Sequence, residues 1–215
     1  ASRAVDDTRG TVAIFGGVPA RMYYSACCGG HTADIRIGWP WKDAYPYLYG
    51  NRDTGDGEKG KSFCYRSSHF RWRVHWSGRT IENILKKTLP KELGVKSSTV
   101  GRLQDIVVQG VGPDGRIKAI EIVTDRGSHV VTGDRIRWVF LPKQGSNAIL
   151  KSTMFKLDVK KAGGKVSAVN LVGGGNGHGI GMCQSGAIRM AEKGYGHEEI
   201  LSHYYPGVSL VRFYP

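Results

Sequence analysis

The sequence GGGNGHGIGMCQSGA occupies residues 173–187 and sets how the chain passes from a strand into a helix. Residues 173–181 include six glycines, and glycine lets the backbone come close to a ligand or to another strand. The run ends where a helix is expected to begin, and a helix N-terminus offers free N–H groups to a polar ligand. The stretch therefore predicts either a binding loop or a glycine-rich turn in which His178 only caps or packs.

The segments around this stretch have the patterns of strands and short helices. Strands are predicted by alternation or by β-forming residues at 11–15, 19–25, 70–76, 103–109, 116–124, 154–159, 165–172 and 208–213. Helices are predicted at 80–91, with Thr80 at a capping position, and at 185–193 and 198–204. We expect one domain over residues 1–215, an α+β fold of mainly antiparallel sheet with a few short helices.

The chain is strongly basic. Its 31 Lys and Arg residues exceed its 18 Asp and Glu residues and give a formal charge of +13, which favours a polyanionic partner or an anionic surface. The basic residues alternate with apolar ones, so most of them are expected on the wet faces of strands. No nucleic-acid-binding motif accompanies the charge, so nucleic acid is not the expected partner. No apolar stretch approaches the roughly eighteen residues of a membrane span.

Four cysteines leave two alternatives open. Cys27 and Cys28 are adjacent and would form a strained bridge with each other, so a disulfide from Cys28, or from Cys27, to Cys64 is the expected pairing. The alternative is a zinc site that also uses His31 and His69, although the paired C-x-x-C spacing of a strong metal signal is missing. For Cys183 a buried inert thiol is expected. A Cys–His hydrolase using Cys28 or Cys183 with His178 is a weaker hypothesis.

Several motifs together resemble one known family. Residues 177–187 and 200–207 are similar to the C-terminal pattern of the stage II sporulation protein D family of lytic transglycosylases and amidase enhancers. Residues 4–10 and the motif Cys28-Gly29-Gly30-His31-Thr32 continue the similarity, as do Phe63-Cys64, Ser67-Ser68-His69 and Trp72. The resemblance covers nearly the whole chain and corresponds to the C-terminal bulk of the family's domain.

The resemblance implies a role on the glycan strands of peptidoglycan. The family's enzymes cleave the bond between N-acetylmuramic acid and N-acetylglucosamine by protonating the leaving oxygen while the sugar's own hydroxyl closes an anhydro ring, so one Glu suffices. That Glu lies upstream of the segment that begins at Ala4. The chain starts at Ala1 without a Met, and we expect that an N-terminal part carrying the acid has been removed. No carboxylate of the chain is nominated in its place.

Two functions therefore remain open for this chain, that of an enzyme fragment and that of a non-catalytic module. The first is part of a lytic transglycosylase; the second binds cell-wall glycan or enhances an amidase. A cell-wall amidase and the chain's own N-terminal fragment are the further partners expected. The resemblance implies an extracellular or periplasmic location in the cell envelope. It implies no cofactor.

A substrate cleft is expected where the two glycine-containing segments meet. One wall would carry His178, Gly179, Met182 and Gln184, with His203 and Tyr204 nearby. The Gln184 amide would offer donors and acceptors to sugar N-acetyl or hydroxyl groups. The segment from Ser25 to Thr32, which includes Gly29, Gly30 and His31, should approach the same cleft, because a glycine pair lets polar backbone face a ligand.

Overall fold

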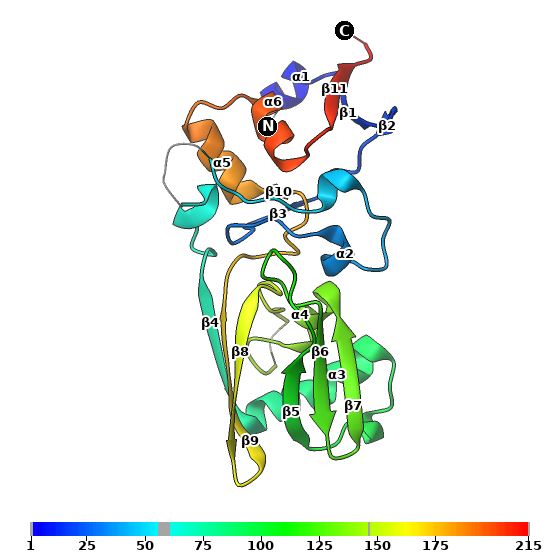
Figure 1. Cartoon of the computed structure of the whole chain (residues 1–215), viewed down its shortest axis with the longest axis vertical. Coiled ribbons are helices and arrows are strands. Elements are labelled where there is room, and N and C mark those ends of the chain that lie inside the picture. Colours follow the sequence, from blue (N-terminus) through cyan, green and yellow to red (C-terminus); the bar gives the residue numbers. More distant parts are fainter. Residues whose placement is uncertain (1, 56–60, 146, 215) are drawn as a thin grey trace.

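The computed structural model describes residues 2–55, 61–145 and 147–214. Figure 1 shows both ends of the chain gathered in one lobe and the middle of the chain in a second lobe. Within the described ranges, residues 2–70 and 174–214 are called the terminal lobe, and residues 71–173 the middle lobe. Each lobe has its own cluster of buried hydrophobic side chains. None of the described helices has the length and apolar character needed to cross a membrane.

Two three-stranded antiparallel sheets form the middle lobe. In one, β9 lies between β4 and β8; in the other, β6 lies between β5 and β7. The bounds are β4 (Trp72–Ser77), β5 (Leu103–Val108), β6 (Ala119–Thr124), β7 (Gly127–Thr132), β8 (Phe155–Ala162) and β9 (Lys165–Gly173). On β4, Trp72 and Trp76 are buried whereas Arg73 and His75 are exposed. The alternation therefore separates core from solvent, as the sequence predicted.

Helix α3 (Gly78–Leu93) covers the core of the middle lobe with its apolar face, which includes Ile81 and Leu85. The helix begins two residues before the predicted start, because Ser77 rather than Thr80 is the N-cap: the Thr80 N–H donates to the Ser77 hydroxyl at 3.2 Å. The short helix α4 (Ile136–Val139) follows β7 and packs against α3.

The terminal lobe joins elements from both ends of the chain. β1 (Thr11–Phe15) pairs with β2 (Val18–Pro19) and with β11 (Ser209–Arg212), while β3 (Tyr24–Ser25) runs parallel to β10 (Met182–Cys183). The helices are α1 (Ser2–Asp7), α2 (Ile35–Gly38), α5 (Gln184–Glu192) and α6 (His197–Tyr204). Short 3-10 helices occur in the terminal lobe at η1 (Pro46–Leu48) and η2 (Phe63–Arg66), and in the middle lobe at η3 (Ser97–Thr99) and η4 (Gly133–Arg135). The predicted α+β fold of mainly antiparallel sheet is confirmed.

The chain passes between the lobes at Trp72 and again at Gly173, which are opposite each other in the β4–β9 ladder. The Trp72 indole N–H donates to the Gly175 carbonyl at 2.9 Å, and the Ser152 hydroxyl donates to the Gly174 carbonyl at 2.6 Å. The start of the glycine run is thereby fixed to the top of the middle lobe.

Candidate functional site

The two segments that the sequence placed at one site lie side by side over their length. Cys27 N–H donates to the Asn176 carbonyl at 3.1 Å, and Asn176 N–H donates back to the Cys27 carbonyl at 2.7 Å. Further along, Ala33 N–H donates to the Gly179 carbonyl at 2.7 Å. The β3–β10 pair extends this contact. Residues 24–33 and 174–186 therefore form one backbone unit.

The glycine run serves contacts inside the protein. Gly179 and Gly181 have φ of +79° and +71°, values that favour glycine. A Cβ at Gly181 would overlap the Tyr23 carbonyl oxygen, and a Cβ at Gly179 would overlap the guanidinium of Arg116. The sequence predicted that the run approaches either a ligand or another strand. In the structure its described contacts are with another strand and with Arg116.

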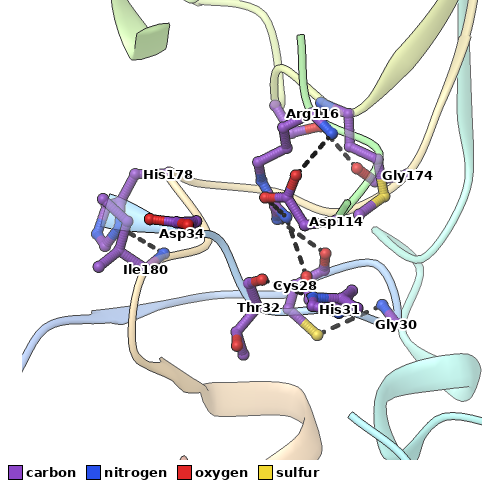
Figure 2. Close-up of polar contacts among 12 residues, drawn as sticks. Cys28, Gly30, His31, Thr32, Asp34, Asp114, Arg116, Gly174, His178 and Ile180 are labelled. Carbon is purple, nitrogen blue, oxygen red and sulfur yellow. Dashed lines mark hydrogen bonds and ion pairs between the residues drawn. The ribbon is translucent and has the colours of Figure 1, made fainter. Parts of the chain in front are cut away.

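Arg116 ties the two lobes together at this unit and was not predicted from the sequence. Its side chain is 0% exposed and donates to the Cys28 carbonyl at 2.9 Å and to the His31 carbonyl at 3.0 Å. The Asp114 carboxylate accepts from the same guanidinium at 3.2 Å. Figure 2 shows Arg116 reaching from above toward Cys28 and His31. The guanidinium thus fixes the Cys28–His31 turn through charge-assisted bonds.

His178 is positioned by a ring contact and by a hydrogen bond to one of its nitrogens. It lies against Trp39, with 4.5 Å between ring centroids, and its Nδ1 accepts from the Ile180 N–H at 3.0 Å. Burial, with the positive charge of Arg137 as the next cause, lowers the pKa of His178 to about 4. The imidazole is therefore neutral at physiological pH, and the acceptor role of Nδ1 is kept.

This burial predicts acid sensitivity. Between about pH 6.5, where an unfolded histidine titrates, and about pH 4, the unfolded state binds the extra proton, so the free energy of unfolding falls as the pH falls. The loss is at most about 3 kcal/mol. Urea unfolding at pH 7 and pH 4.5 measures it, and H178Q is expected to show a smaller loss because its side chain does not titrate. An equal loss in both proteins, or an NMR titration midpoint for His178 near its ordinary value, would contradict the assignment.

The other residues predicted for the cleft wall are in different environments. Met182 is half-buried in β10, and Gln184 is exposed at the first position of α5. Tyr204 is buried, and its hydroxyl donates to Asp53 at 2.6 Å; His203 is half-buried beside it, with 4.7 Å between ring centroids. Ser25 is buried in β3.

An open groove of about 530 Å³ lies beside the Cys28–His31 turn. Gly29, Gly30 and His31 line it, whereas His178, Gly179, Met182 and Gln184 do not. The remaining lining residues are Thr54, Lys61, Ser62, Tyr65, Phe70, Arg71, Asp114 and Met154. Of the predicted site residues, Gly29, Gly30 and His31 thus face a cavity, whereas Ser25 and the predicted residues of the second segment do not line it.

The groove combines aromatic rings with cations. The Arg71 guanidinium lies 3.8 Å from the centre of the Phe70 ring, and the Lys61 ammonium lies 5.1 Å from the centre of the Tyr65 ring. Arg71 also donates to the Gly29 carbonyl at 3.0 Å, which holds it against the turn. The Ser62 hydroxyl is buried near Gly30 and has no hydrogen-bond partner among the described residues. The surface therefore presents apolar faces, positive charge and hydrogen-bonding groups together.

The expected disulfide is not formed. All four cysteines are free and buried, and the Sγ atoms of Cys28 and Cys64 are 3.6 Å apart, well beyond an S–S bond of about 2.05 Å. The disulfide was inferred for two sulfurs alone, but Cys183 and Asp53 lie beside them. The Sγ atoms of Cys28, Cys64 and Cys183 and a carboxylate oxygen of Asp53 all lie within 4.8 Å of one another. The histidines of the predicted zinc alternative are not in this cluster; His31 Nδ1 lies 2.8 Å from the Thr32 carbonyl.

Comparison with known proteins gives a family model and three curated relatives. The model, described as "Domain of unknown function (DUF8618)", matches residues 58–181. The amidase enhancer of Bacillus subtilis is 26% identical over 99% of this chain and 32% of its own length, and stage II sporulation protein D of Bacillus amyloliquefaciens is 24% identical over 97% and 50%. An uncharacterized protein of Brachyspira hyodysenteriae is 29% identical over 98% of the chain and 48% of its own length. The chain thus spans half or less of each relative.

Proposed function

This chain belongs to the family described as a domain of unknown function (DUF8618) and to the wider family of amidase enhancers and stage II sporulation protein D, and from this premise we propose that its groove binds the glycan strands of peptidoglycan. The names of the relatives support a cell-wall-related role and a location in the cell envelope. The observation that carries the proposal is the pairing of Phe70 with Arg71, and of Tyr65 with Lys61, along one groove beside Gly29–His31.

The groove's chemistry suits an acidic amino sugar. Aromatic rings offer flat apolar faces against which the C–H face of a sugar can pack, and a cation held beside each ring can attract a carboxylate. An N-acetylmuramic acid residue without a stem peptide carries a free lactyl carboxylate and an N-acetyl group, and the backbone of Gly29–His31 and the Ser62 hydroxyl supply polar partners. The formal charge of +13 draws the polyanionic cell wall toward the protein.

Proton donation is proposed to come from outside these residues. Asp114 is the acidic side chain among the described residues that line the groove, and it is buried in an ion pair with Arg116. For cleavage of the bond between N-acetylmuramic acid and N-acetylglucosamine, the resemblance implies the family's Glu as the acid, and with it the chain would form part of a lytic transglycosylase. Without it the chain would act as a glycan-binding module or amidase enhancer.

Binding to purified peptidoglycan tests the groove. We expect salt-sensitive binding, weakened about tenfold by F70A and by R71Q, because each removes one half of the stacked pair. The matched control is R73Q, which removes the same charge from the exposed face of β4 and should bind as the wild type does. Equal weakening by R71Q and R73Q would show that net charge alone drives binding and would refute the groove.

The same incubation separates the two functional alternatives. Soluble anhydro-muropeptides released by this chain alone would place the acid among its own residues and overturn the proposed division of roles. Stimulation of a purified cell-wall amidase without such products would favour the enhancer role.

A further inference from the structure

We propose that Cys28, Asp53, Cys64 and Cys183 form a structural metal site that takes one divalent ion with the preferences of zinc. The proposal concerns the core of the terminal lobe and does not depend on glycan binding. The ligands are three thiolates and one carboxylate, in place of the Cys/His set of the zinc alternative that the sequence left open. Two of them, Asp53 and Cys183, were not suggested as ligands by the sequence.

The spacing of the donor atoms fits a single tetrahedral ion. Zinc binds sulfur at about 2.3 Å, which places two sulfurs of a tetrahedron about 3.8 Å apart. The Cys28 and Cys64 sulfurs are 3.6 Å apart, and Cys28 Sγ lies 3.1 Å from Asp53 Oδ2. All four donor atoms lie within 4.8 Å of one another. The cluster is thus too wide for a disulfide and already close to the size of a coordination shell.

The surrounding groups orient the proposed ligands. Gly30 N–H donates to Cys28 Sγ at 3.4 Å, and Cys28 N–H donates to Cys183 Sγ at 3.2 Å; Figure 2 shows the first of these bonds. Gly186 N–H, in the first turn of α5, also donates to Cys183 Sγ at 3.4 Å. The Tyr204 hydroxyl donates to the second Asp53 oxygen, Oδ1, at 2.6 Å. Such outer contacts fix the direction of metal ligands and stabilise thiolate charge.

A buried carboxylate among thiols also needs a positive partner. Asp53 is 0% exposed, and the groups beside it are the Tyr204 phenol, the Cys28 thiol and the His203 imidazole, whose Nε2 is 3.8 Å from Oδ1. That Nε2 is itself buried and has no hydrogen-bond partner among the described residues. A cation at the centre of the cluster would neutralise this charge where three thiols cannot.

The site would be closed and structural. Cys28, Cys64 and Cys183 are at most 1% exposed, as is Asp53. Cys28 lies in the turn after β3, Asp53 in the loop before η2 and Cys64 in η2, and Cys183 ends β10 as the N-cap of α5. Four protein donors leave no position for substrate, which is the arrangement of structural zinc. Because the thiols must lose their protons to bind a metal ion, metal uptake is expected to weaken at acid pH.

Metal content of the whole chain decides the proposal. After purification under reducing conditions, loading with zinc and desalting, we expect one zinc per chain by elemental analysis, and cobalt loading should give the charge-transfer absorption of thiolate ligands. A wild-type chain that retains no zinc, and whose cysteines are then free thiols or a Cys28–Cys64 disulfide by non-reducing mass spectrometry, would overturn the site.

Variants test the ligand set. C64S and D53N should lose most of the bound zinc, whereas C27A removes a neighbouring buried thiol that is outside the set and should keep it. Because a variant can lose metal by failing to fold, circular dichroism is recorded for each variant. In a separate experiment a strong chelator is added to the wild type. We expect the chelator to lower the melting temperature and added zinc to restore it. Loss of zinc in C27A equal to that in C64S would contradict the assignment.

Discussion

Replacing Arg116 with methionine is expected to lower the free energy of unfolding by about 3–5 kcal/mol, because the Asp114 carboxylate then remains buried without its charged partner. The variant also leaves the carbonyls of Cys28 and His31 without their donor, and an unsatisfied buried acceptor costs further free energy. Urea unfolding at fixed pH measures the change. Because Arg116 fixes the turn that lines the groove, weaker peptidoglycan binding should accompany it.

Two further variants show whether the buried pair is the cause. Adding D114N to R116M removes the stranded charge and should recover part of the loss. Combining R116M with G179A should cost less than the sum of the single changes, because a Cβ at Gly179 collides with the guanidinium that R116M removes. A loss below about 1 kcal/mol for R116M would show that the interior does not depend on this ion pair.

Local patterns predicted the fold class and most strands because each pattern reports its own segment. Alternation on β4 and the apolar face of α3 needed no distant information, and the resemblance to the sporulation and amidase-enhancer family is confirmed by the relatives. Two of the strand predictions differ from the structure. The single strand expected at 19–25 is divided into β2 and β3, and β7 (Gly127–Thr132) was not predicted although it completes a sheet with β6.

The candidate site was less predictable because long-range contacts determine it. Arg116 lies 85 residues from His31 and 88 from Cys28 along the chain, and nothing in its own segment indicates burial. The same holds for Asp53 beside Tyr204, 151 residues away. The motif residues Gly29–His31 do face a groove, whereas the aromatic and cationic residues opposite them, such as Phe70 and Arg71, look in sequence like an ordinary alternating strand.

The glycine run illustrates why composition alone left two alternatives. Because glycine can adopt a positive φ, its backbone can come close either to a ligand or to a neighbouring strand. The position of the partner in the folded protein shows which of the two applies. At Gly181 the partner is the backbone of Tyr23, immediately before the β3–β10 pair. The residue type is therefore required there by backbone packing as well as by its positive φ.

G181A is accordingly expected to lower the free energy of unfolding by about 3 kcal/mol or more, the sum of left-handed backbone strain and a forced separation of β10 from Tyr23. The matched control is G194A: Gly194 has a similar positive φ of +92°, but a Cβ there meets nothing within 4 Å, so only the strain of about 1 kcal/mol should appear. Urea unfolding of the two variants gives the difference. Equal losses would mean that the strand contact is soft and that the run tolerates a side chain, which would leave room for a ligand there after all.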